Sequence, residues 1–126
     1  MSILIDTSAW IEYFRSGSNS EKIDFLIDEN LVITNDIILA ELIPFLKVRK
    51  HHKLVRLLYN INKLEMAINW KQVIEYQTQC LKSGLNGVGI PDLLIAQNAK
   101  QNNSQIYSLD NHFNLLEPII NIQLFR

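Results

Sequence analysis

Short apolar runs alternate along this chain with segments in which apolar residues recur every three or four positions. Runs such as Ile3-Leu4-Ile5 predict short buried strands, and the wider spacing predicts amphipathic helices. Strands that alternate with helices favour an α/β fold in which helices cover both faces of a mostly parallel sheet. In such folds, functional sites lie beyond the carboxyl ends of the strands.

The predicted boundaries follow from these two spacings and from turn and cap residues. The predicted strands are residues 3–5, 31–34, 64–67, 105–109 and 119–124. The predicted helices are residues 9–15, 18–29, 36–46, 47–59, 70–81 and 91–101, with a short helix after residue 110. Ser18 and Glu21 have the capping-box spacing at the start of the second helix. Pro44 is expected to end or kink the third helix near Ile43.

The size and composition of the chain exclude several classes of protein. Its 126 residues, 48% of them hydrophobic, predict one domain with an independent core. The single cysteine, Cys80, follows an apolar helical stripe and is expected in that core. No uncharged apolar run approaches the roughly 18 residues of a membrane span, and Asp6 interrupts the apolar start before a signal peptide could form. We therefore expect a soluble, cytoplasmic protein with no membrane partner.

The formal net charge of −1 conceals a strong division along the chain. Residues 1–41 hold eight acids against two bases, a net of −6, and residues 65–126 hold five acids against four bases, a net of −1. Residues 42–64 hold six bases and no acid, a net of +6. A segment of this kind can contact a nucleic-acid backbone, and the alternative is a solvated helix face.

Four acids lie where their neighbours do not explain them. Asp6 directly follows the first predicted strand, and Asp110 follows a later one. Glu41 is the only charge inside a long apolar segment, where an unpaired carboxylate is costly to bury. Asp92 follows Pro91 at a predicted helix start, where a carboxylate is favoured in any case. The alternatives to a site are turns, helix caps and, for Glu41, a buried ion pair or a position at a solvent-exposed edge of its helix.

If the four acids converge, they need a cation. Two carboxylates about 5 Å apart repel by roughly 3 kcal/mol at an effective dielectric of 20. Oxygen ligands without a histidine or cysteine favour Mg²⁺ or Mn²⁺ over zinc, and these ions activate water and neutralise phosphate in hydrolysis. His112 is expected to be an exposed polar residue outside the site. Asn86-Gly87-Val88-Gly89 predicts a turn, because no lysine follows as in a phosphate-binding loop.

Four short motifs, in this order and in a chain of this length, resemble the PIN-domain nucleases. Within that family they are most similar to the short VapC-type toxins of bacterial and archaeal toxin–antitoxin pairs, and the resemblance spans essentially the whole chain. The motifs are Asp6-Thr7-Ser8, Ala40-Glu41-Leu42, Pro91-Asp92 before Leu93-Leu94-Ile95-Ala96, and Ser108-Leu109-Asp110-Asn111-His112-Phe113.

The resemblance implies a three-layer α/β/α sandwich with the acids at the carboxyl end of its sheet. Asp6 and Asp92 would be the principal Mg²⁺ ligands, with Mn²⁺ able to substitute. The catalytic set would be completed by two supporting acids, Glu41 and Asp110. The remaining residues that it implies would line the pocket, and they are Thr7, Ser8 and Ser108. Ser108 stands where many members of the family have threonine.

The resemblance also implies an activity and partners. The expected reaction is hydrolysis of RNA phosphodiester bonds by metal-activated water, and the expected protein partners are a cognate antitoxin and a second copy of the chain in a homodimer. The alternative is a catalytically inactive PIN-like module that binds RNA or protein. The bases expected to contact RNA or the antitoxin are Lys47, Arg49, Lys50 and Lys53.

Overall fold

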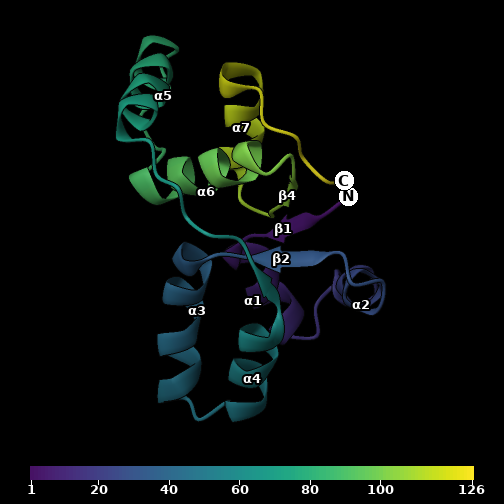
Figure 1. Cartoon of the computed structure of the whole chain (residues 1–126). Coiled ribbons are helices and arrows are strands. Elements are labelled where there is room, and N and C mark those ends of the chain that lie inside the picture. The colour runs from purple at the N-terminus through teal and green to yellow at the C-terminus, as the bar shows by residue number, and fades with distance from the viewer.

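A four-stranded parallel sheet lies at the centre of the computed structural model, which describes all 126 residues (Figure 1). The strand order is β3-β2-β1-β4, and Leu4 pairs with Ile33 on one side and Ile106 on the other. The strands are β1 (Ile3–Ile5), β2 (Val32–Thr34), β3 (Asn62–Lys63) and β4 (Gln105–Tyr107). The predicted α/β fold with a mostly parallel sheet is confirmed.

Seven helices surround this sheet. In Figure 1, the α3–α4 hairpin extends to one side of the strands, and α5, α6 and α7 group together on the other side. The helices are α1 (Thr7–Phe14), α2 (Ser20–Asp28), α3 (Asp36–Val48), α4 (His52–Asn60), α5 (Trp70–Lys82), α6 (Ile90–Gln101) and α7 (Asn111–Ile120). None of these helices is both long enough and apolar enough to cross a membrane.

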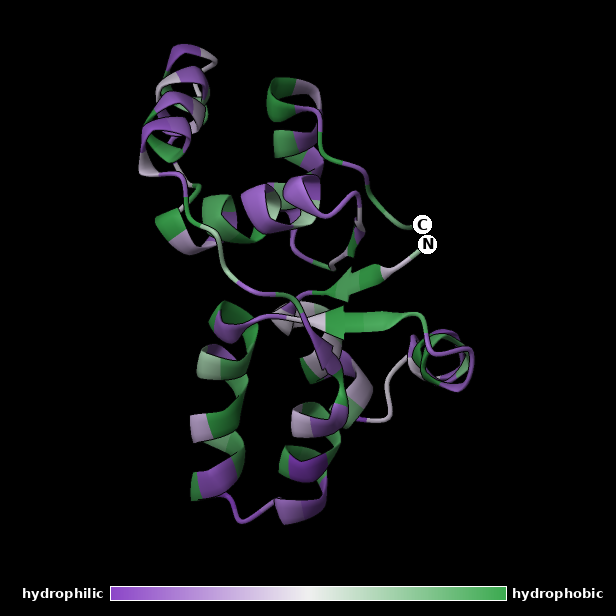
Figure 2. Cartoon of the chain, viewed as in Figure 1, coloured by the Kyte–Doolittle hydropathy of each residue, from purple (hydrophilic) through white to green (hydrophobic).

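One continuous core joins the sheet to all seven helices. It contains 31 buried apolar residues, including the whole of β1, whose three side chains are fully buried. Figure 2 shows β1 and most of β2 as hydrophobic, which fits strands covered on both faces. Cys80 is fully buried, so its predicted place in the core is confirmed. Burying both faces of β1 holds Asp6, the next residue, at a defined position.

Helix α6 is the buried helix of the fold. Its residues Leu93 to Ala99 are all buried, and Gly89 and Pro91 mark its start. Asn98 on this helix accepts a hydrogen bond from the Asn35 side chain at 2.9 Å and donates to the Glu65 carbonyl at 3.0 Å. Asn35 also caps α3 by accepting from the Ile38 amide. These buried hydrogen bonds fix the start of α3 relative to α6.

Two of the three prolines, Pro44 and Pro118, lie beyond the first turn of a helix. The sequence predicted that the first of these helices ends or kinks near Ile43. It does not end there, because α3 continues through Pro44 to Val48. Buried side chains lie on both sides of Pro44, and we attribute the continuation to this packing, which outweighs one missing backbone hydrogen bond. The same reasoning applies to α7, which passes Pro118 and ends at Ile120.

Three other predicted elements differ from those in the structure. The strand expected at 119–124 is replaced by the end of α7 and a single bridge between Leu124 and Ile106. The strand expected at 64–67 lies slightly earlier, as the two residues of β3. Helix α2 begins at Ser20, and no Ser18–Glu21 capping box forms, because Ser18 donates to the Glu12 carboxylate instead.

The segment expected as one basic helix over 47–59 is divided. Lys47 belongs to the end of α3, a turn follows, and α4 begins at His52. Lys50 in this turn has a positive φ of 59°, which reverses the chain direction. The helix expected over 36–46 is also less buried than its composition indicates, because Ala40, Glu41 and Pro44 form an exposed edge.

Candidate active site

Asp6 lies at the carboxyl end of β1 and is 5% exposed. Its backbone N–H donates to the Tyr107 carbonyl at 2.9 Å, which extends the β1–β4 pairing by one residue. The hydroxyls of Ser8 and Ser108 donate to its Oδ2 at 3.0 and 2.8 Å. Asp6 is therefore held by two hydroxyls on one oxygen, and its Oδ1 has no hydrogen-bond partner within the chain.

The two serines join β1 to the segment after β4. While donating to Asp6, Ser8 Oγ accepts from the Leu109 amide at 3.0 Å, and Ser108 Oγ accepts from the Asp110 amide at 2.9 Å. The two hydroxyl oxygens are 3.1 Å apart. The expected pocket-lining serines thus lie beside Asp6, where they tie it to the backbone of Asp110.

Glu41 lies in the second turn of α3. The Thr7 hydroxyl donates to its Oε1 at 3.0 Å, which joins α3 to the start of α1. Although much of the residue is exposed, burial of its carboxyl raises the Glu41 pKa, and the Asp6 and Asp92 carboxylates raise it further. The hydrogen bond from Thr7 acts in the opposite direction but is outweighed. The charges of two other candidate acids, Asp6 and Asp92, therefore act on the Glu41 carboxyl.

Asp92 lies in the first turn of α6, and its side chain is 21% exposed. Burial is the largest cause of a raised Asp92 pKa, and the Asp110 and Asp6 carboxylates contribute in the same direction. A hydrogen bond and charge interaction with His112 lower the pKa in part. Asp110 caps α7, since its Oδ1 accepts from the His112 amide at 2.9 Å.

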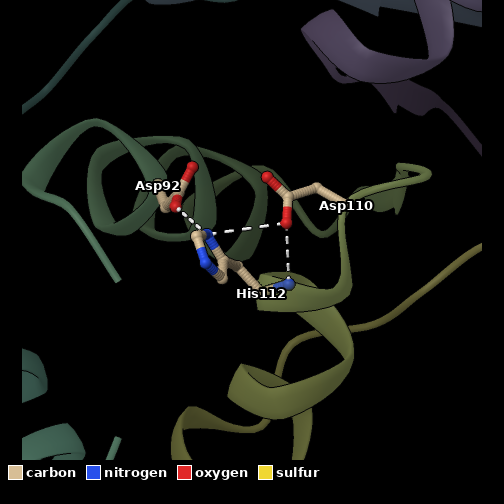
Figure 3. A group of neighbouring side chains, drawn as sticks. All are labelled: Asp92, Asp110 and His112. Atoms are coloured by element: carbon tan, nitrogen blue, oxygen red, sulfur yellow. Dashed lines mark hydrogen bonds and ion pairs between the residues drawn. The ribbon is translucent and has the colours of Figure 1, made fainter. Parts of the chain in front are cut away.

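The imidazole of His112 lies between two of these acids (Figure 3). Its Nδ1 is 3.0 Å from Asp92 Oδ2 and 3.5 Å from Asp110 Oδ1. The expectation that His112 is an exposed polar residue outside the site is wrong, because the cap that Asp110 makes at the start of α7 brings residue 112 back towards the carboxylates. The N-cap pattern in the sequence was the signal for this placement.

The four acids gather at the carboxyl ends of β1 and β4 and near the starts of three helices. No lysine or arginine pairs with any of them, because the ion pairs of these two residue types are Lys63 with Asp36 and Arg126 with Glu117. The alternative of a buried ion pair for Glu41 is therefore excluded. We call the four residues the acid cluster, and they are Asp6, Glu41, Asp92 and Asp110.

The sequence profile of the family described as PIN domain matches residues 3–117. This chain belongs to the PIN domain family. Two curated relatives are "VapC ribonuclease Mb1587" of Mycobacterium bovis and "Ribonuclease VapC11" of Mycobacterium tuberculosis. Each is 29% identical over 128 residues, an alignment that covers 96% of this chain and 96% of the relative.

Solved structures share the fold over nearly the whole PIN domain. VapBC2 from Rickettsia felis, bound to a DNA fragment from the promoter, has a TM-score of 0.78 at 22% identity and covers 99% of this chain and 98% of its own. DNA-bound VapBC from Salmonella typhimurium has a TM-score of 0.77 at 17% identity, with 99% and 97% covered. At these identities the likeness concerns the fold.

The residues of this PIN domain fit a divalent metal ion. Family membership implies such an ion, and ligand atoms of Asp92, Asp110 and His112 lie within 4.8 Å of one another. Asp6 adds an oxygen that no group of the chain occupies. Two or more carboxylates without a lysine or arginine partner suit a hard divalent ion. The donor set departs from the all-oxygen expectation only in the imidazole nitrogen.

The bases predicted to contact RNA or a partner lie away from the acid cluster. They occupy the far end of the α3–α4 hairpin. Lys47 is six residues beyond Glu41 on α3, about 9 Å along the helix axis at 1.5 Å per residue, and the other three lie in the turn or on α4. The Arg49 guanidinium stacks on the Phe45 ring at 4.4 Å. We call the four predicted bases the basic tip, and they are Lys47, Arg49, Lys50 and Lys53.

A groove of about 600 Å³ runs between α3 and β3–α4. Its floor is apolar and its rim carries charges from Asp36, Lys47 and Lys63. The exposed edge of α3 that forms one wall includes Ala40 and therefore adjoins Glu41. Sequence reasoning missed this groove because it depends on the packing of α3 against α4.

Proposed function

We propose that this chain is a divalent-metal-dependent endoribonuclease that acts as the toxin of a toxin–antitoxin pair and hydrolyses RNA phosphodiester bonds. The observation that carries the proposal is the acid cluster, four carboxylates without a lysine or arginine partner at the carboxyl end of the sheet of a PIN domain. The names of the curated ribonuclease relatives support the same activity.

Asp6 and Asp92 are the principal ligands of the ion in this proposal, with Glu41 and Asp110 as supporting acids. We assign Mg²⁺ as the ion, with Mn²⁺ able to substitute, because these ions favour carboxylate oxygens. When bound, such an ion supplies positive charge that acidifies water and stabilises charge on the phosphate.

The side chains around the cluster determine how each acid acts. Ser8 and Ser108 occupy Asp6 Oδ2, so that Oδ1 is the oxygen free to face the ion. Thr7 occupies Glu41 Oε1 and leaves Oε2 as the atom that takes up the proton of the attacking water. The raised Glu41 pKa suits this role, because a general base works best with a pKa closer to the working pH.

The basic tip extends the proposed RNA-binding surface. Distances of about 9 Å and more from Glu41 correspond to a few nucleotides of an extended strand, so phosphates on either side of the cleaved bond can reach the tip. Contacts of this kind position the substrate without reading its sequence. The basic tip is therefore proposed to increase RNA affinity and its salt dependence.

The proposed protein partners are a cognate antitoxin and a second copy of the chain. The groove between α3 and β3–α4 adjoins Glu41, so an apolar antitoxin segment bound there lies beside the acid cluster. Exposed apolar side chains on α5, Trp70, Ile74 and Leu81, are candidates for the homodimer contact. Light scattering after gel filtration measures the oligomeric state directly.

Cleavage of a panel of labelled RNAs by the purified protein tests the function. We expect cleavage with Mg²⁺, no cleavage with EDTA, and a loss of at least about a hundredfold in Asp6→Asn. The matched control is Asp28→Asn, an exposed aspartate at the end of α2 that should leave the rate unchanged. Equal cleavage under all conditions would contradict the mechanism, and RNA binding without cleavage would favour the inactive binding module.

A further inference from the structure

We propose that His112 is itself a ligand of the metal ion, which gives this PIN domain a mixed oxygen and nitrogen site that favours Mn²⁺ over Mg²⁺. The inference rests on the proposed function, since it requires a divalent ion at the acid cluster. It assigns a role to a residue that lies outside the four carboxylates.

The spacing of the donor atoms is that of neighbouring ligands on one ion. In an octahedral site with metal–ligand distances of about 2.1 Å, adjacent ligands are about 3.0 Å apart. His112 Nδ1 lies 3.0 Å from Asp92 Oδ2 and 3.5 Å from Asp110 Oδ1. An ion placed among these three atoms can therefore reach them with shifts of a few tenths of an ångström.

The surroundings of the imidazole hold Nδ1 towards the acids. The ring belongs to the first turn of α7, whose start is fixed by the Asp110 cap. The loop at Gly87 lies along the opposite edge, where a Cβ on this glycine would be 3.7 Å from Nε2. In the metal-free chain Nδ1 donates to Asp92 Oδ2, and Nε2 makes no hydrogen bond within the chain. Nε2 can therefore carry the ring proton when an ion takes the place of the proton on Nδ1.

Ligand chemistry then determines the preferred ion. Mg²⁺ favours oxygen ligands and gives up water reluctantly, whereas later divalent ions accept imidazole more readily. One nitrogen among carboxylates should therefore increase Mn²⁺ affinity more than Mg²⁺ affinity. We expect Mn²⁺ to bind at least about tenfold more tightly than Mg²⁺ and to displace Mg²⁺ from the site.

Electron paramagnetic resonance of Mn²⁺ bound to the full chain tests the inference. Pulsed measurements detect ¹⁴N coupled to the ion, and we expect this signal in the wild-type protein. His112→Asn should abolish it and weaken Mn²⁺ binding about tenfold, while Mg²⁺ affinity, measured by competition, changes less than threefold. His51→Asn, in the turn before α4, is the matched control and should retain both the signal and the affinity.

Because the wild-type spectrum is itself a test, the inference does not depend on the folding of a variant. Bound Mn²⁺ without a ¹⁴N signal in the wild type, or with an equal signal in His112→Asn, would overturn the inference. RNA cleavage by the same preparation with Mn²⁺ would then leave the proposed function standing. A chain that binds no Mn²⁺ and cleaves no RNA would overturn both.

Discussion

Replacing Asp92 by Asn should stabilise the metal-free protein and weaken its response to metal. The substitution keeps the shape of the side chain and an oxygen that can accept from His112, but it removes one charge from the acid cluster. Ligand atoms of Asp92 and Asp110 are no more than 4.8 Å apart. At effective dielectrics between 20 and 80, two charges at this distance repel by about 1 to 3.5 kcal/mol.

The net gain in the free energy of unfolding of Asp92→Asn is at the lower end of this range. The side chains are 21% and 39% exposed, so water screens their repulsion, and the substitution also weakens the attraction to His112. We therefore expect the free energy of unfolding to rise by about 1 kcal/mol in EDTA. For a domain of this size, that corresponds to a melting temperature about 4 °C higher.

Divalent metal should reverse the order of stabilities. At a concentration one hundred times its Kd, an ion that binds only the folded state adds about 2.7 kcal/mol to the wild type. A variant that binds tenfold more weakly gains less than about 1.5 kcal/mol by the same relation. Scanning calorimetry in EDTA and in Mg²⁺ gives both comparisons.

A matched control separates the cluster from general charge effects. Glu75→Gln removes a carboxylate from the exposed side of α5 and should change the melting temperature by less than about 2 °C, with the wild-type gain from metal retained. The reasoning is refuted if Asp92→Asn lowers the melting temperature in EDTA, or if metal stabilises this variant as much as the wild type.

Four further outcomes are expected. The folded-state pKa values of Glu41 and Asp92 are raised, chiefly by burial, so these groups bind more protons in the metal-free fold than in the unfolded chain, and their contribution to stability should decline as pH rises through and above about 4. Denaturation in EDTA at increasing pH should show the wild type losing stability relative to the double variant Glu41→Gln/Asp92→Asn, and a pH-independent difference would contradict this. Asn35→Ala removes the α3 cap and leaves the buried Asn98 side-chain oxygen on α6 without a donor, so urea denaturation should show a loss of about 2 to 3 kcal/mol. The more exposed α5 cap should lose about 1 kcal/mol in Asn69→Ala. Calorimetry should show Mg²⁺ binding about tenfold weaker in Ser108→Ala and unchanged in Ser108→Thr, which keeps the hydroxyl. Equal Mg²⁺ affinities of Ser108→Ala and the wild type would exclude a supporting role for this hydroxyl. Neutralising the basic tip with glutamine should raise the KM for RNA and flatten its salt dependence without changing kcat, and an unchanged KM would show that the tip does not contact the substrate.

Local signals in the sequence determined the elements that carry the acids. Asp6 could be placed because a run of three apolar residues ends just before it, and Asp92 because Gly89 and Pro91 mark a helix start. These signals involve neighbours within a few residues. Because parallel strands end at one edge of a sheet, the fold class predicted a common edge for Asp6 and Asp110, and the family resemblance implied the same place for Glu41 and Asp92.

Tertiary packing decided the rest. Helices continue through Pro44 and Pro118 where buried side chains on both sides outweigh the local preference to stop, and the basic segment divides because the chain turns at Lys50 to pack α4 on α3. His112 entered the site because a cap at Asp110 and the start of α6 meet in space, twenty residues apart in sequence. Such contacts depend on distances across the fold, which the pattern along the chain does not contain.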